Sequence, residues 1–228
     1  MPAPGPARLT RARLTRARLT RARLTRARLT RARLTRARLT WHGAARYTGR
    51  MTFGVRQFEL ALMHRMRDLN PARVEEALAA MGATRAELRD AHARWTRMAY
   101  APGAPKGVAA LCRTLGPPAH RGVRQAGSLT CEVFRWALPS WPGLEFEALA
   151  GPGGEVWNQW FVRPSPRAAP AFGELVPWAC VVADLAAFPG ATQGEGGAPH
   201  HWTAGFTHEG AGYRALFVYG LLQRLDRA

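Results

Sequence analysis

The sequence predicts an α+β fold in which a helical region is followed by a small antiparallel sheet and a C-terminal helix. Three observations support this class. Apolar residues recur every three or four positions over 52–115, every second position from about residue 128, and at helical spacing again over 212–227. The expected regions are a low-complexity repeat head (1–50), a helical region (51–118) and a mixed region that carries the sheet and the last helix (119–228).

Four helices are expected in the helical region, and local signals mark where they begin and end. Asn70-Pro71 is typical of a cap followed by proline at the first helical position. Gly82 favours the end of that helix, and Thr84 with Glu87 forms a capping box for the next one. The apolar stripes are Val55, Phe58, Leu62, Met66 and Leu69; Val74, Leu78 and Met81; Leu88, Ala91, Trp95 and Met98; and Val108, Leu111, Cys112 and Leu115.

Strand-forming residues dominate the chain after residue 128. The segments 128–138 and 144–162 are rich in β-forming residues, and the Gly-Pro-Gly-Gly sequence at 151–154 predicts a turn between two strands of a hairpin. The apolar segment 176–188 fits a buried strand or a helix equally well. We expect a loop over 189–199, a further strand over 201–206, and a C-terminal helix with one apolar side formed by Tyr213, Leu216, Phe217, Leu221 and Leu225.

The head consists largely of a perfect repeat, because RARLT occurs six times without substitution over residues 11–40. A five-residue period turns successive leucines by about 140° on a helix and places them on alternate faces of a strand, so neither geometry has an apolar side. In the frame A-R-L-T-R, residues 7–40 resemble the pentapeptide-repeat family, whose unit is Ala, Asp or Asn, Leu and two variable residues. The resemblance implies a square-sided right-handed β-helix with leucine stacked inside. The sequence departs from the family at the Asp/Asn position, where arginine stands in every copy.

Two other interpretations of the head remain open. Identical copies indicate recent duplication of a short DNA tract, and the abundance of arginine, alanine, glycine and proline is typical of a GC-rich bacterial genome. Met51 follows the repeat, so translation starting there would leave residues 1–50 unmade. If the head is made, we expect a cationic tail that is disordered or loosely helical.

Charge is concentrated in the head. The chain carries a formal charge of +18, and residues 1–50 hold 15 of its 33 basic side chains and no acidic one. The remaining residues are nearly neutral. Such asymmetry favours non-specific association with nucleic acid through arginines such as Arg13, Arg16 and Arg18.

A weaker nucleic-acid signal lies in the helical region. Two helices that meet at Gly82, with a capped restart at Thr84, resemble a DNA-binding helix-turn-helix. The resemblance implies that Arg85 and Arg89 contact nucleic acid. A purely structural pair of helices is the alternative, because any two capped helices around a glycine show this pattern.

Carboxylates in the expected hairpin suggest an enzyme as the alternative class. Glu145 and Glu147 share one strand face, with Glu155 across the hairpin, and paired carboxylates serve as acid and base. The competing interpretation, which we favour, is the solvent-exposed face of an amphipathic strand. Asp184 interrupts an apolar run, so we expect a structural ion pair with an arginine there.

Tryptophans offer a third possibility, a protein-interaction domain with an aromatic sheet face. Trp157 and Trp160 are three residues apart and point to opposite faces of a strand. An exposed tryptophan beside Arg135 or Arg163 could stack on a base or bind a peptide. Core packing is the alternative.

Other familiar chemistries lack their sequence signatures. His200, His201 and His208 do not converge in an extended chain, so we expect no metal site, and no cofactor motif is present. The three cysteines are far apart, and no apolar run is long enough to span a membrane. The sequence therefore predicts a soluble cytoplasmic binding protein with nucleic acid as its expected partner, and it leaves the oligomeric state open.

Overall fold

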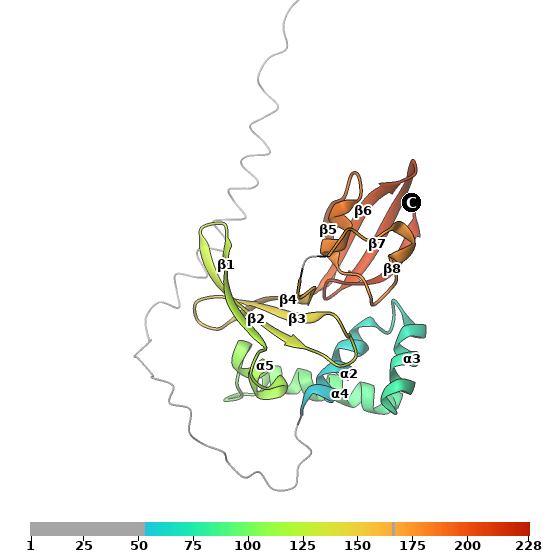
Figure 1. The fold of residues 1–228 in the computed structure, drawn as a ribbon. Coiled ribbons are helices and arrows are strands. Elements are labelled where there is room, and N and C mark those ends of the chain that lie inside the picture. Colours follow the sequence, from blue (N-terminus) through green and yellow to red (C-terminus); the bar gives the residue numbers. More distant parts are fainter. Residues whose placement is uncertain (1–52, 166) are drawn as a thin grey trace, which may run out of the picture. The chain divides into compact units, whose positions relative to one another are not determined.

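The computed structural model describes residues 53–165 and 167–228 (Figure 1). Met51–Ala228 forms a compact unit separate from Met1–Arg50. The repeat head lies outside the described residues. The expectations made for it, including the roles of Arg13, Arg16 and Arg18, lie outside them as well.

Within the described residues, four helices precede the first strand, as the sequence predicts. They are α2 (Val55–Met66), α3 (Pro71–Met81), α4 (Arg85–Tyr100) and α5 (Gly107–Leu115). The helix α2 packs mainly against α4, and most of its residues are buried because it lies between α4 and the first sheet. The apolar stripes expected from sequence supply the helical part of the main core.

The predicted caps are confirmed. The side chain of Asn70 accepts a hydrogen bond from the Arg73 amide at 3.3 Å, and Gly82 ends α3 with a φ of 58°. The hydroxyl of Thr84 accepts from the Glu87 amide at 3.2 Å, while the Glu87 carboxylate accepts from the Thr84 amide at 2.8 Å. These bonds satisfy backbone donors that the first turn of a helix leaves free.

The first sheet is an antiparallel meander in the order β1-β2-β3-β4. Its strands are β1 (His120–Ala126), β2 (Leu129–Ala137), β3 (Glu145–Ala150) and β4 (Val156–Val162). The hairpin expected over 144–162 is therefore confirmed. One face of this sheet covers the helices (Figure 1), and on that face Phe146 packs edge-on against Phe58 of α2 at 5.2 Å.

The chain then builds a second four-stranded meander, so the expectation of a single small sheet was wrong. Its order is β5-β6-β7-β8, preceded by two short 3₁₀ helices. These elements are η1 (Phe172–Glu174), η2 (Val182–Ala187), β5 (Thr192–Glu195), β6 (His201–His208), β7 (Ala211–Val218) and β8 (Leu221–Arg227). A smaller apolar core, which includes Leu185 and Phe217, lies between η2 and this sheet.

The predicted C-terminal helix is wrong, because residues 211–227 form the β7–β8 hairpin. A two-residue turn at Tyr219 and Gly220 joins the strands, with φ values of 50° and 69° and Val218 paired to Leu221. Positive φ at both central residues is typical of a type I′ turn, which suits the twist of a hairpin. The apolar spacing of four between Tyr213 and Phe217 keeps residues on one face of a strand as well as on one face of a helix.

The ambiguous segment 176–188 forms neither a long strand nor an α-helix. Val181 makes an isolated β-bridge to Leu221, and η2 follows directly. The Asp184 carboxylate accepts a hydrogen bond from the Val181 amide at 3.0 Å and so caps this short helix.

Gly220 should tolerate no side chain. A Cβ there would lie 2.9 Å from the Trp160 Cβ, and the φ of 69° strains any L-residue. We expect Gly220→Ala to lower the free energy of unfolding by about 1–3 kcal/mol in urea denaturation. Gly153→Ala is the matched control, since Gly153 has open space around it and no positive φ. Equal stabilities for the two variants would contradict this close approach.

Candidate ligand-binding cleft

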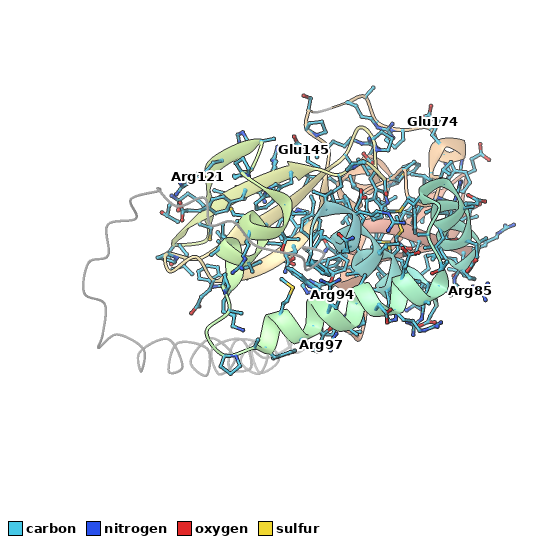
Figure 2. The ribbon with its side chains drawn as sticks, turned by 90° about the horizontal axis from the view of Figure 1, so that it is seen from below. Arg85, Arg94, Arg97, Arg121, Glu145 and Glu174 are labelled. Atoms are coloured by element: carbon cyan, nitrogen blue, oxygen red, sulfur yellow. The ribbon has the colours of Figure 1, made fainter. Side chains whose placement is uncertain are left out.

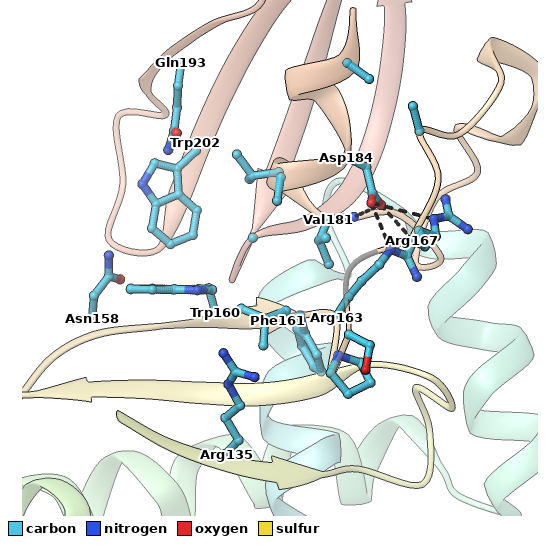
Figure 3. Close-up of a pocket in the computed structure, with 18 residues that line it drawn as sticks. Arg135, Asn158, Trp160, Phe161, Arg163, Arg167, Val181, Asp184, Gln193 and Trp202 are labelled. Carbon is cyan, nitrogen blue, oxygen red and sulfur yellow. Dashed lines mark hydrogen bonds and ion pairs between the residues drawn. The ribbon is translucent and has the colours of Figure 1, made fainter. Parts of the chain in front are cut away.

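A cleft of about 920 Å³ opens beside β4, on the face of the first sheet that points away from the helices (Figure 3). Its other walls come from the segment after β4, from η2, and from β5 and β6 of the second sheet. This volume lies within the range of pockets that hold small ligands. Polar and aromatic residues in its lining include Arg135, Trp160, Arg163, Arg167, Asp184 and Trp202.

Two tryptophans from different sheets face this cleft. In β4, Phe161 packs into the main core, so the alternation of the strand turns Trp160 to the opposite face. Figure 3 shows the Trp160 ring lying along β4 and Trp202 pointing toward it from β6. No contact joins these two rings in the described part of the chain. The amide side chains of Asn158 and Gln193 lie at the same end of the cleft.

Glu147 is buried beneath arginines on this outer face, so the expectation of a solvent-exposed strand face was wrong. Its side chain is 0% exposed, and Arg135, directly opposite on β2, donates from Nε to its Oε2 at 2.7 Å. Arg124 of β1 donates to the same oxygen at 3.0 Å. Its Nη2 also lies 2.8 Å from Oε1, which receives no hydrogen bond of good geometry. Glu145 adds a longer contact of 3.6 Å to Arg135.

The two carboxylates proposed as acid and base are therefore held in ion pairs. Their shared partner is Arg135, and Arg124 also lies over the Trp160 ring, 5.8 Å from its centroid. Glu155 is in the loop before β4 and lines a different hollow. Catalysis by Glu145 and Glu147 stays a prediction, one that requires these ion pairs to open.

Asp184 has the arginine partner that the sequence predicts. Arg163 donates to its two carboxylate oxygens at 2.8 Å each, and Arg167 approaches at 3.8 Å. Burial alone would raise the pKa of Asp184. The hydrogen bonds from Arg163 and the Val181 amide, together with the two arginine charges, outweigh burial and hold that pKa below its usual value.

Arg167 is the arginine of the cleft best placed to meet a ligand. Its side chain is 40% exposed, against 17% for Arg163. Within the described residues, its only ionic contact joins Nε to Asp184, so its terminal nitrogens have no hydrogen-bond partner. Arg163 also donates to the carbonyl oxygen of Ala179 at 2.8 Å, which leaves it fewer donors.

The arginines proposed for a helix-turn-helix lie on α4, and Figure 2 shows Arg85 at one end of this helix. Arg85 and Arg89 are exposed, but Arg85 donates to Glu75 of α3 at 2.7 Å. The main packing partner of α4 is α2 rather than α3. Nucleic-acid contact by Arg85 and Arg89 stays a prediction, and the structure does not bring them into the cleft.

The histidines noted in the sequence lie near the two ends of β6. His200 stacks on Tyr219 at 4.6 Å, and His208 stacks on Phe172 at 4.2 Å. Among the residues that the structure describes, no three histidine, cysteine or acidic side chains are grouped to hold a metal ion. Within the same residues, no helix is long and apolar enough to span a membrane.

Sequence reasoning named Trp157 and Trp160, with Arg135 and Arg163, as a possible aromatic and basic group. Trp160, Arg135 and Arg163 line the cleft, and Trp157 does not. Sequence reasoning missed Trp202 and Arg167. The alternation of β6, which buries Ala204 and Phe206, also fixes the face of Trp202 and was a usable signal. Arg167 follows β4 outside any regular element, so no periodicity could place it.

In the comparison with known proteins, the first match lies in the repeat head. The family model for pentapeptide repeats matches residues 7–41 with eight copies. The resemblance seen in the A-R-L-T-R frame is thus confirmed for this segment, and the match does not extend into the rest of the chain.

Two further comparisons concern the chain as a whole. No curated protein matches it. One solved structure, from Streptococcus mutans and described as a "putative beta-lactamase inhibitor protein", is 17% identical. The similarity covers 55% of this chain and 84% of that chain, with a TM-score of 0.25. A score this low supports no inference about fold or function.

Proposed function

We propose that the protein binds single-stranded nucleic acid, with a base held in the cleft and the repeat head attracting the phosphate backbone. One observation carries the proposal for the cleft. Trp160 and Trp202 face the same space from two sheets, and Arg167 lies toward the other end of the same cleft, beside Asp184. This combination of aromatic rings and arginine is typical of proteins that bind unpaired strands.

Stacking on tryptophan explains why a single strand is preferred to a duplex. Every base has a flat face, and stacking on an aromatic side chain contributes about 1–3 kcal/mol per base. In a duplex those faces are already covered by neighbouring base pairs. A base that enters between Trp160 and Trp202 must therefore come from an unpaired strand.

The charges near the cleft suit one or two phosphates. Arg167 lines the cleft and is 40% exposed, and Arg124, which lies over the Trp160 ring outside that lining, is 41% exposed; each also contacts a carboxylate. Most of the attraction must come from elsewhere, because Glu145, Glu147 and Asp184 offset the arginines around them. The 15 basic residues of the head supply it, since the head contains no acidic residue.

Replacing Trp160 tests the cleft directly. We expect Trp160→Ala in the full chain to weaken binding of a labelled oligothymidylate of about 12 nucleotides by roughly 10-fold or more, measured by fluorescence anisotropy. The affinity should be measured at about 0.2 M salt, where the electrostatic attraction between the head and the oligonucleotide is reduced.

Trp157→Ala is the matched control. Trp157 belongs to the same strand and is 46% exposed, but it does not line the cleft. Its removal should leave the affinity unchanged. Unchanged affinity in Trp160→Ala, or equal losses in the two variants, would rule out base binding in the cleft.

A further inference from the structure

Histidines and arginines gather where the end of α2 meets the loop before β6. We call this group the histidine–arginine junction. Its members are His64, Arg65 and Arg67 at the end of α2, His92 on α4, and His200 and His201 at the start of β6. Arg65 joins the two halves, because its Nη2 donates to the carbonyl oxygen of Pro199 at 3.2 Å.

The first half of the junction is a stacked pair of imidazole rings. His64 and His92 lie 4.1 Å apart at an interplanar angle of 12°. Arg67 contacts Nε2 of His64, and Nδ1 of His92 is buried with no hydrogen-bond partner among the described residues. Two neutral rings can stack in this way, whereas two charged rings would repel each other and the arginine.

The second half is His200 stacked on Tyr219. The rings lie 4.6 Å apart at 19°, and both residues have positive φ, 63° and 50°. The type I′ turn accounts for the φ of Tyr219, whereas few non-glycine residues outside such turns adopt the φ of His200, which persists where surrounding contacts enforce it. The stack and the Arg65–Pro199 hydrogen bond are such contacts.

The charges that face these histidines are almost all positive. Burial lowers the pKa of His64 to about 4, and the nearby His92, Arg67 and Arg65 add to the effect. Asp68, the opposing carboxylate, acts to raise this pKa, but it is 82% exposed and does not outweigh burial and the positive groups. The junction is therefore built for neutral imidazoles.

The second pair shows the same behaviour. Burial lowers the pKa of His200 to about 4, helped by Arg65 and His201, and it also lowers the pKa of His201. Burial raises the pKa of Tyr219, so that ring stays neutral and cannot offset a charge on His200.

The junction is connected to the cleft through the β7–β8 turn. The amide of Tyr219 donates to the His200 carbonyl at 2.8 Å, and the Tyr219 carbonyl accepts from the Phe161 amide at 2.7 Å. The carbonyl of Gly220 accepts from the Val182 amide at 3.0 Å. Phe161, Val182 and Gly220 all line the cleft, so one turn contacts both the junction and the ligand site.

We propose that the histidine–arginine junction is an acid-sensitive latch on the cleft. Protonation of its histidines adds positive charge beside Arg65 and Arg67, separates the loop before β6 from α2, and frees the Tyr219–Gly220 turn from β4. The nucleic-acid site then loses one wall. The identity of the ligand rests on the function proposed above, while the latch itself does not.

The direction of the pH dependence follows from the lowered pKa values. A histidine released to solvent titrates near its ordinary pKa of about 6.5, whereas His64 and His200 in the closed junction titrate near 4. Between about pH 4 and pH 6.5, the open form therefore binds more protons than the closed form. Closure is therefore fully favoured above about pH 6.5 and weakens as the pH falls toward 4.

Hydrogen exchange of the full chain tests the latch. Between pH 7 and pH 5, we expect the protection of backbone amides over 159–163 and 217–222, corrected for intrinsic exchange, to fall by at least roughly tenfold. The far-UV circular dichroism should stay constant over the same range. Loss of protection that coincides with loss of ellipticity would indicate global unfolding and overturn the proposal.

Variants separate the junction from other histidines. His64→Gln with His200→Gln should reduce the pH dependence of protection, with His92 and His201 left to titrate. Arg65→Gln, which removes the hydrogen bond to the Pro199 carbonyl, should move the transition to higher pH. His120→Gln is the control, because His120 is exposed on β1, outside the junction. A pH dependence that persists unchanged in the first two proteins would overturn the latch.

Binding of the same oligothymidylate distinguishes the latch from the proposed function. Weaker binding at pH 5 than at pH 7, with a smaller difference in the double variant, supports both. A pH-dependent change in protection without oligothymidylate binding at either pH supports the latch and overturns the proposed ligand.

Discussion

Replacing Glu147 with alanine is expected to lower the free energy of unfolding by about 3–5 kcal/mol, the typical effect of removing one partner from a buried ion pair. Glu147 is fully buried and neutralises Arg135, whose side chain is only 20% exposed. Without the carboxylate, that guanidinium keeps its charge in a place with little water, with only the 3.6 Å contact to Glu145 remaining. Urea denaturation of the full chain measures the change.

A second ion pair in the same sheet provides the control. Arg121 and Glu132 also join β1 to β2, but their side chains are 66% and 35% exposed. Exposed pairs contribute about 0–1 kcal/mol, so Glu132→Ala should have a small effect. A double variant with leucine at 135 and 147 should recover much of the stability lost in Glu147→Ala, because an apolar pair leaves no buried charge. Equal effects of Glu147→Ala and Glu132→Ala would show that water reaches the buried pair.

The helical region was predictable because its signals are local. Each of these signals acts within a few residues of one helix end. Examples are the Asn70 cap, the Gly82 stop and the capping box of Thr84 with Glu87. These interactions form whatever the rest of the chain does. Apolar spacing then determined which side of each helix is buried.

The C-terminal hairpin was missed because its spacing fits two periods at once. Residues four apart, such as Tyr213 and Phe217, share a face in both a helix and a strand. Gly220 within the apolar run was the distinguishing signal, since glycine weakens a helix and suits a tight turn. Giving that glycine more weight would have predicted the turn and a larger β content.

The candidate site depended on contacts that a strand pattern cannot describe. Alternation correctly placed Glu145 and Glu147 on one face, but it does not say what covers that face. The cover for Glu147 comes from Arg135 and Arg124 on neighbouring strands, and strand register is set over long distances in the chain. The cleft needs two sheets, so Trp160 and Trp202 could not be paired from sequence alone.

Removing residues 1–50 is expected to weaken binding of a single-stranded oligonucleotide by roughly 10³-fold or more at about 0.05 M salt. Each phosphate that a basic side chain neutralises releases counterions, which makes the logarithm of affinity fall with the logarithm of salt concentration by about 0.7 per phosphate on single strands. If about half of the head's 15 basic residues contact phosphate, the full chain should show a slope of about −5. The chain of residues 51–228, with 18 basic and 15 acidic groups, should show a slope of about −1.

Changing the order of residues in the head tests whether the head binds through its number of charges or through an ordered shape. A head of the same composition in shuffled order keeps every arginine but destroys the pentapeptide repeat. Because phosphate contacts position a protein without reading sequence, we expect the shuffled head to bind with the same slope as the natural one. A matched head with its repeat arginines changed to glutamine should behave like the truncated chain. A marked loss of affinity on shuffling alone would contradict a charge-only role and assign binding to the ordered solenoid that pentapeptide repeats form in their family.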